Sequence, residues 1–268
     1  MRYAKQAALP LITFIFFTNL IGCTAQSPEA DKDNLTAGYN ALDSRQYDDA
    51  INRADTQLTK SDGGESSAEA FYLKGRAYEQ REKANPTQAH SDLETAASYY
   101  QQALTLNPAP SLQGYIHASL GNVNYWRDDY ITALQQFSVA YDLVDSPDLK
   151  SFILYRAGLC QQRMGQFDLA DKSFQAVQQR FPGTDAANRA REHQGFRSFS
   201  VRVATFSSAQ AADLAMQALR VTGLSDVERR DLPNGRSIVL VGPESTYTEA
   251  LAMKARVVTQ YSDAIIIP

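Results

Sequence analysis

The sequence of 268 residues is poor in the residue types on which catalytic and metal sites depend. It has two cysteines, Cys23 and Cys160, which excludes a framework of several disulfides. Its three histidines have neither cysteine neighbours nor the spacing of a metal site. It also lacks a phosphate-binding glycine loop with its lysine and a nucleophile elbow. The sequence therefore predicts a protein that is not an enzyme and has no cofactor and no metal.

Strong charge of one sign is also lacking. The chain has 26 basic and 30 acidic residues, for a formal net charge of −4. Residues 197–268 hold eight bases and seven acids, whereas residues 23–196 hold sixteen bases and twenty-three acids. No basic surface of the kind that binds phosphate backbones is indicated, so we expect no nucleic-acid partner. The acidic part is the less suited of the two to lie against an anionic surface.

Long apolar runs are absent except at the N-terminus. Residues 1–22 begin with Arg2 and Lys5 and continue with an apolar run from Ala7 to Ile21. This order of charge, apolar core and small residue is typical of a secretory signal peptide. The run of about 15 residues contains Pro10 and is shorter than the roughly 20 residues that a membrane-crossing helix needs. A permanent transmembrane anchor is therefore disfavoured.

The signal ends in "LIGC", residues 20–23, which resembles the lipobox of bacterial lipoproteins. The resemblance implies cleavage before Cys23, acylation of its thiol and attachment to a membrane through the acyl chains. Residues 23–33 would then form a polar tether. Thr24, rather than an aspartate, follows the cysteine, which implies the outer membrane of the cell envelope, with the protein facing the periplasm. The alternative is an ordinary signal peptide with a chance cysteine.

Residues 34–194 contain four similar segments, and internal repeats of this length determine the architecture. Each segment has a small residue in its first half and an alanine in its second half. Three of the alanines are followed four residues later by an aromatic residue, which puts both on one helix face. The matching positions are Gly38, Gly75, Gly121 and Gly158, then Ala50, Ala96, Ala133 and Ala170, then Tyr100, Phe137 and Phe174.

This pattern resembles the tetratricopeptide repeat (TPR), a pair of antiparallel helices in about 34 residues. The second to fourth segments match better than the first. A polar insertion, residues 81–94, is expected to be a loop or a helix extension, and "GTDAANRAREHQG" is expected to form a final helix. Cys160 is expected to be a buried structural thiol.

The resemblance to TPR proteins implies a groove, lined by the first helix of each pair, that binds a protein or peptide partner. The candidate groove residues are polar or aromatic positions on those helices: Arg76, Asn122, Tyr125 and Arg156. The alternative is that Tyr125 and Trp126 only pack between repeats.

Beyond a linker at residues 195–198, the helical period gives way to alternation. The strands "FSVRVATF", "RSIVLVG" and "AIIIP" and two helices give the order strand, helix, strand, strand, helix, strand. This order predicts four antiparallel strands with two helices on one face. The expected fold class is therefore α+β with several domains, an all-α TPR-like solenoid followed by a ferredoxin-like βαββαβ domain.

Residues 199–268 resemble the SPOR (sporulation-related) domain in "FSVRVATFSSAQAADLAMQAL" and in "GRSIVLVGPESTYTEALAMKARV". The resemblance implies binding to peptidoglycan, with preference for denuded glycan strands, on the open face of the sheet. Alternation puts Val201, Val203, Val239 and Val241 toward the helices. The candidate glycan-binding residues are then Ser200, Arg202, Ala204, Ile238 and Leu240, with Arg236 as a further hydrogen-bond donor. Arg202 and Ala204 depart from the glutamine and glycine that are common in the family.

Three functions compete for this combination of parts. An RNA-recognition domain has the same element order, but "RSIVLVG" lacks the aromatic residues that stack on bases, so we discard it. The first remaining function is a wall-binding lipoprotein that recruits a protein partner to peptidoglycan, in the cell envelope or at division sites. The second is a TPR scaffold lipoprotein for assembly of envelope complexes, in which the C-terminal domain docks protein rather than glycan.

Overall fold

The computed structural model describes residues 29–61 and 63–268, so the predicted signal peptide and Cys23 lie outside the described residues. Contacts divide the described chain into two compact units, one that extends to Ala157 and one that runs from Gly158 to Pro268. The predicted linker at residues 195–198 therefore lies inside the second unit rather than between the two.

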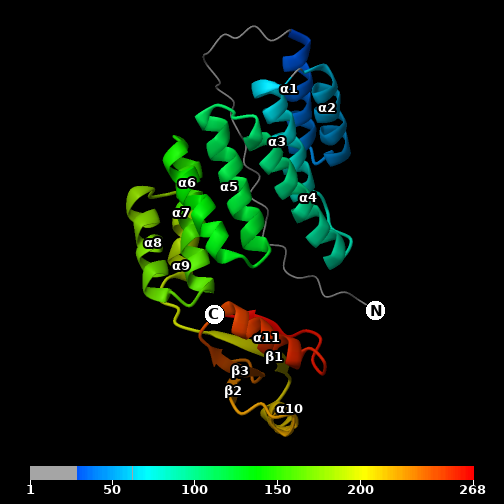
Figure 1. The fold of residues 1–268 in the computed structure, drawn as a ribbon. Helices are drawn as coiled ribbons and strands as arrows, with labels where there is room; N and C mark the ends of the chain where they lie inside the picture. The colour runs from blue at the N-terminus through cyan, green and yellow to red at the C-terminus, as the bar shows by residue number, and fades with distance from the viewer. Residues whose placement is uncertain (1–28, 62) are drawn as a thin grey trace. The chain divides into compact units, whose positions relative to one another are not determined.

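Helices make up most of the described residues between 29 and 193, and they form the predicted pairs (Figure 1). From α1 to α6 each helix packs against the next, α8 packs against α9, and α3 also contacts both α1 and α5, so these first helices lie side by side. The pairs are α1 (Glu29–Asp43) with α2 (Tyr47–Lys60), α3 (Gly64–Gln80) with α4 (Pro86–Thr105), α5 (Pro110–Trp126) with α6 (Tyr130–Leu143), and α7 (Pro147–Arg163) with α8 (Phe167–Arg180). The predicted final helix is α9 (Asp185–His193).

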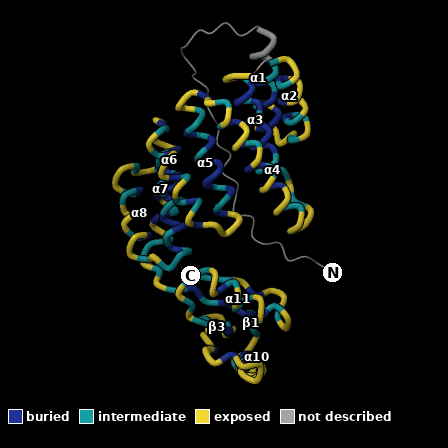
Figure 2. Tube along the Cα trace, in the orientation of Figure 1, coloured by how far each residue is buried: buried dark blue, intermediate teal, exposed yellow. Residues whose placement is uncertain are grey.

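Glycine and an aromatic ring make the closest approach within three of the pairs. A Cβ atom added to Gly121 would lie 2.6 Å from a ring carbon of Phe137, and one added to Gly158 would lie 2.6 Å from a ring carbon of Phe174. Tyr100 faces Gly75 in the same way. All three rings are fully buried. Because glycine has no side chain, the two helices can close on a large ring without leaving a cavity. Figure 2 shows buried positions recurring along these helices.

The polar insertion is a short loop followed by an extension of α4. Asn85 caps the helix by accepting a hydrogen bond from the Gln88 amide at 2.9 Å. One turn further on, the buried carboxylate of Asp92 bonds to Arg81 and lies 3.1 Å from the Lys83 ammonium. Two cations thus tie the loop to the extended helix.

The C-terminal region has the predicted order, with β1 (Phe199–Phe206), α10 (Ala209–Val221), β2 (Val227–Asp231), β3 (Ser237–Glu244), α11 (Tyr247–Val257) and β4 (Ile265–Ile267). The strands form one sheet in the order β2-β3-β1-β4, and every neighbouring pair is antiparallel. Val201, Val203, Val239 and Val241 form a buried core with Leu219 of α10 and Val257 of α11.

An irregularity in β1 changes which residues face outward. Arg202 lies opposite Leu240, but Ala204 lies opposite Val239, so β1 has one extra residue between these pairs. Such a bulge resets the alternation of side chains. Ala204 and Phe206 consequently pack against the core, and the prediction that Ala204 lies on the open face is wrong. Thr205, opposite Ile238, is exposed instead.

Two further expectations for the sheet face are corrected. Leu240 is only 2% exposed, because β3 is an interior strand and the long side chains of Arg202 and Glu228 lie opposite it on either side. Arg236 precedes β3 and lies in the turn after β2, where its carbonyl accepts a hydrogen bond from the Leu232 amide. Neither residue is an exposed strand position.

The last repeat packs against the sheet domain within the second compact unit. The Arg163 guanidinium lies 3.2 Å from the ring centre of Tyr247 at the start of α11. Phe167 and Phe199 lie with ring centres 5.9 Å apart, and the backbone of Gly165 closely approaches the Ser245 carbonyl. This packing explains why the second unit begins inside α7.

The linker is also fixed to the last repeat. The Gly195 amide donates a hydrogen bond to the Asp171 carboxylate at 2.9 Å, and the Arg197 guanidinium pairs with the same carboxylate at 2.8 Å. Both bonds attach residues 195–198 to α8.

Candidate binding surfaces

A row of polar and aromatic residues crosses the first helices of the second and third pairs and reaches α7. It contains all four predicted groove residues. Glu79 of α3 joins them, since its carboxylate accepts a hydrogen bond from the Asn122 amide of α5 and another from the Tyr100 hydroxyl at 2.6 Å. We use the name first-helix row for Tyr72, Arg76, Glu79, Asn122, Tyr125 and Arg156.

Arg76 is held at the α3 end of the first-helix row. Its Nη1 atom donates a hydrogen bond to the Tyr72 hydroxyl at 3.0 Å. Burial opposes the charge on Arg76, but Tyr72, Tyr100 and Glu79 favour it, so the pKa of its guanidinium is raised. Burial therefore does not neutralise Arg76.

Arg156 of α7 lies among three aromatic rings at the other end of the row. Its guanidinium carbon is 4.9 Å from the ring centre of Tyr125, 5.3 Å from that of Trp126 and 5.2 Å from that of Phe152. Tyr125 is buried and also packs edge-on against Tyr130, whereas Trp126 is 54% exposed. Tyr125 thus packs between helices and contacts Arg156, while Trp126 stays open to solvent; a role of Tyr125 in binding a partner stays a prediction.

Two atoms of the first-helix row have unfilled hydrogen-bonding capacity. Within residues 29–61 and 63–268, buried side-chain polar atoms without a hydrogen-bond partner are found at Gln57 Oε1, Asn122 Oδ1 and Arg156 Nε. Buried polar atoms in folded proteins are nearly always bonded, so each exception needs an explanation. Two of the three exceptions belong to residues that the sequence predicted to line a groove.

Sequence reasoning missed Tyr72, Glu79 and Phe152. Tyr72 and Glu79 lie four residues before and three residues after Arg76, so helical spacing alone could have found them. Phe152 lies four residues before Arg156, at the same spacing.

The open face of the C-terminal sheet combines cations with branched apolar side chains. Arg202, Thr205 and Ile238 lie there, and Ser200 occupies the same face at the start of β1. The edge strands add residues that the sequence did not single out. They are Glu228 and Arg230 of β2, which form an ion pair at 3.1 Å, and Ile265 and Ile267 of β4, opposite Arg202 and Ser200.

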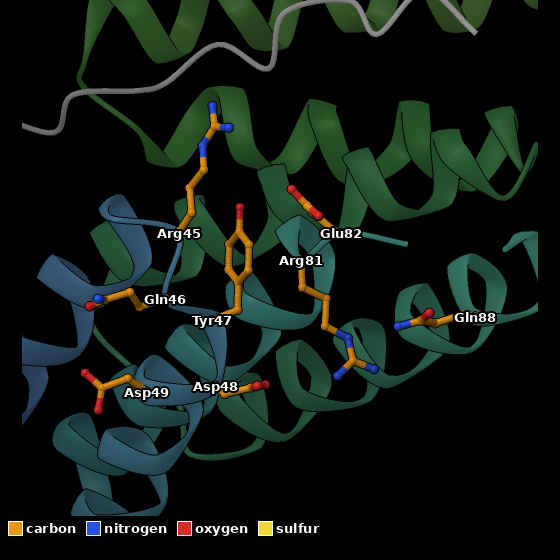
Figure 3. Close-up of a pocket in the computed structure, with 8 residues that line it drawn as sticks. All are labelled: Arg45, Gln46, Tyr47, Asp48, Asp49, Arg81, Glu82 and Gln88. Carbon is orange, nitrogen blue, oxygen red and sulfur yellow. The ribbon is translucent and has the colours of Figure 1, made fainter. Parts of the chain in front are cut away.

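A separate hollow of about 570 Å³ lies where the turn between α1 and α2 meets the turn between α3 and α4 (Figure 3). Its wall mixes both charges, and Arg81 is already bound to Asp92. Burial raises the pKa of the Tyr47 hydroxyl. The charge of Arg45 opposes this rise, and the charge of Glu82 adds to it. The residues that line it are Arg45, Gln46, Tyr47, Asp48, Asp49, Arg81, Glu82 and Gln88. This hollow has no side chain in common with the first-helix row.

The part of the chain that the structure describes lacks two features. None of its helices has the length and apolarity to cross a bilayer. In the same residues, histidine, cysteine and carboxylate side chains form no group of three or more that could hold a metal ion.

Comparisons with known proteins agree with the helical architecture. The tetratricopeptide repeat family matches residues 153–184, which cover the C-terminal part of α7 and all of α8. The crystal structure of a thermophilic TPR protein from Thermus thermophilus is similar, with a TM-score of 0.51 and 18% sequence identity over 62% of this chain and 82% of that chain. No curated protein matches this sequence. The chain is therefore a mostly helical, TPR-like solenoid with a small C-terminal antiparallel sheet.

Proposed function

We propose that this protein is an exported, lipid-anchored adaptor without enzymatic activity. Its helical repeats bind a protein partner along the first-helix row, and its C-terminal domain binds peptidoglycan. The observation that carries the proposal is the first-helix row, whose charged and amide groups lie on the first helices of successive pairs, with the exposed aromatic surface of Trp126 beside them. Such a mixture is typical of protein interfaces, where aromatic residues and arginine contribute most of the binding energy.

Site-specific photo-crosslinking tests the partner-binding surface. A photoreactive amino acid in place of Trp126 should yield a discrete crosslinked species in cells. The matched control puts the same amino acid at Val139, an exposed position on α6, outside the first-helix row. Equal crosslinking at both positions, or none at Trp126, would count against a partner on the first-helix row.

The glycan-binding part of the proposal rests on the SPOR-like sequence and on the chemistry of the open sheet face. Sugar rings need hydrogen-bond donors beside flat apolar surface. Arg202 supplies donors, and Ile238 and Ile265 supply apolar surface in the same face. The preferred ligand would be glycan strands without stem peptides.

Co-sedimentation of the full chain with isolated sacculi tests glycan binding. We expect more protein to pellet with sacculi stripped of stem peptides by an amidase than with intact sacculi. The double variant Arg202→Glu with Ile265→Asp should stay in the supernatant. The control Arg256→Glu makes the same arginine-to-glutamate substitution on α11, which covers the opposite face.

A negative sedimentation result would favour the second candidate function. In that case the C-terminal domain docks protein, and the repeats form a scaffold for assembly of envelope complexes. One observation favours it, since the packing of Arg163 on Tyr247 already makes the domain part of the solenoid's last repeat.

Attachment to the outer membrane through Cys23 completes the proposal. Cells fed a labelled fatty acid should incorporate the label into the protein, and Cys23→Ala should abolish both the label and recovery in the membrane fraction. If the Cys23→Ala protein stays labelled, the anchor lies elsewhere. Fractionation of inner and outer membranes would test the location, and imaging of a tagged chain would test a role at division sites.

A further inference from the structure

Helix α10 carries a second apolar face in addition to the one that covers the sheet. Ala212, Ala215 and Leu219 are buried on the side that faces the strands. On another side of the same helix, Leu214 is 62% exposed and Val221 is 88% exposed, the highest value among the exposed large apolar side chains of the described residues. Exposed apolar surface that gathers on one element marks an interaction site.

The exposed residues of α10 are spaced as in a helix that packs along another helix. They follow each other at intervals of three, four and three residues, which keeps them in one line along the helix. We use the name α10 seam for Ala211, Leu214, Ala218 and Val221. The exposed Ile131 and Val139 of α6 lie eight residues apart and form no such line.

The charged residues of α10 bond to β2 and leave the α10 seam neutral. The Asp213 carboxylate accepts a hydrogen bond from the Arg229 guanidinium at 2.6 Å, and the Arg220 guanidinium donates one to the Val227 carbonyl at 3.0 Å. Gln217 lies at the edge of the seam and is exposed. A partner of either charge would gain no ion pair along this seam. An amide both donates and accepts hydrogen bonds, so Gln217 can pair with the same residue of a second copy.

The order of residues along the α10 seam is self-complementary. The small Ala218 lies close to the midpoint between Leu214 and Val221, with one large side chain on each side of it. When two such helices pack antiparallel about a two-fold axis near Ala218, Leu214 of each copy faces Val221 of the other. The alanines at the axis let the two backbones come close.

We propose that two copies of this chain associate through the α10 seam as an antiparallel helix pair. One helix from each copy buries less than the roughly 800 Å² per partner of a stable interface, so the association is weak and reversible. Because α10 covers the side of the sheet opposite Arg202 and Ile238, the pair leaves the open face accessible. This inference does not depend on the proposed function.

Disulfide trapping in cells tests the helix pair, because a covalent bond retains even a transient contact. Ala218→Cys puts a thiol next to the two-fold axis, and an added oxidant should give a disulfide-linked species of twice the chain mass. Ala252→Cys is the matched control, since Ala252 is an exposed alanine of α11, and it should give no such species. The wild type gives the background from Cys23 and the buried Cys160.

Charges introduced at the two large residues test the antiparallel order. In the Ala218→Cys chain, Leu214→Glu alone or Val221→Lys alone should lower the crosslinked fraction about tenfold, because each puts a charge against an apolar side chain. Leu214→Glu together with Val221→Lys should restore it, since the new carboxylate of each copy then faces the new ammonium of the other. All three positions are exposed, so the sheet domain should stay folded, which circular dichroism would check.

Three results would overturn the helix pair. One is equal crosslinking, or none, at Ala218→Cys and Ala252→Cys. Another is a combined variant that crosslinks as poorly as either single charge variant. The third is a crosslinked species whose mass is not twice that of the chain, because a different protein would then cover the α10 seam.

Discussion

The helical repeats and the C-terminal sheet build their cores from different residues. In the repeats, single large rings such as Phe137 and Phe174 fill the space left by glycines on the facing helix. In the sheet domain, the buried core consists of valine, alanine and leucine spread over three strands and two helices. The repeat core therefore depends on a few matched pairs, whereas the sheet core shares its stability among many small contacts. Four predictions test this difference.

The largest effect is expected from a charge in the interior of the sheet. Leu240→Asp should destabilise the sheet domain by about 4 kcal/mol, because it buries an unpaired carboxylate. Ile238→Asp on the same strand and face should cost less, since Ile238 is only half-buried. Urea unfolding would measure both. Equal, small effects would mean that Leu240 is as accessible as the sequence alone suggested.

The contact between the last repeat and the sheet should be nearly as sensitive. Gly165 has φ of +76°, and an added Cβ atom would lie 2.6 Å from the Ser245 carbonyl oxygen. Gly165→Ala should therefore cost about 3 kcal/mol through backbone strain and steric overlap. Gly183→Ala is the matched control, since Gly183 has a similar φ of +84° but nothing within 4 Å. If Gly165→Ala lowered the free energy of unfolding no more than Gly183→Ala, the last repeat and the sheet domain would separate easily.

Matched glycines in the repeats should respond unequally to alanine. Gly121→Ala pushes a methyl group into the Phe137 ring and should cost about 2 kcal/mol, even after the gain in helix propensity. Gly38 of the first repeat meets a terminal methyl group of the buried Leu73 side chain, which can shift more easily than a ring, so Gly38→Ala should cost less. Thermal unfolding would measure the difference. Equal losses would show that the first repeat is packed like the others.

The smallest effect is expected from the ion cluster at Asp92. Burial alone would raise the pKa of the Asp92 carboxyl, but hydrogen bonds and charge from Arg81 and Lys83 outweigh it, so this pKa is lowered. Its contribution to stability is complete above the unfolded-state pKa of about 4 and is lost as the pH falls through the lower folded-state value. Asp92→Asn should therefore be less stable than the wild type at pH 6, and the difference should shrink toward pH 3. Thermal unfolding at both values checks the sign, and a constant difference would contradict it.

The solenoid was largely predictable because helical positions keep their period. Gly121, Ala133 and Phe137 recur at fixed spacing, and that spacing survives in the structure as a buried contact. The same regularity placed Asn122, Tyr125 and Arg156 on neighbouring helices. Their role in binding stays a prediction. The contact of Arg156 with the rings of Tyr125 and Trp126 was not predicted, because it depends on how α5 and α7 pack against each other.

The sheet face was less predictable because one extra residue changes the orientation of all that follow. Alternation correctly placed Val201 and Arg202, but the bulge after Arg202 turned Ala204 inward and Thr205 outward. Nothing in "FSVRVATF" marks that bulge. Burial of Leu240 depends on long side chains from two neighbouring strands, which no single-strand pattern contains.

The attachment of the linker, residues 195–198, to α8 limits where this chain can be divided into fragments. The sequence suggests a cut near residues 195–198, yet Asp171 anchors both Gly195 and Arg197 to α8, and the second compact unit begins at Gly158. Proteolysis or truncation at residue 197 would separate Phe199 from Phe167. It would also separate Tyr247 from Arg163. A cut inside α7 would in turn break helical hydrogen bonds. The smallest fragment expected to keep the sheet domain intact therefore starts before Pro147, and any recombination that moves this domain to another protein would have to carry its last repeat along.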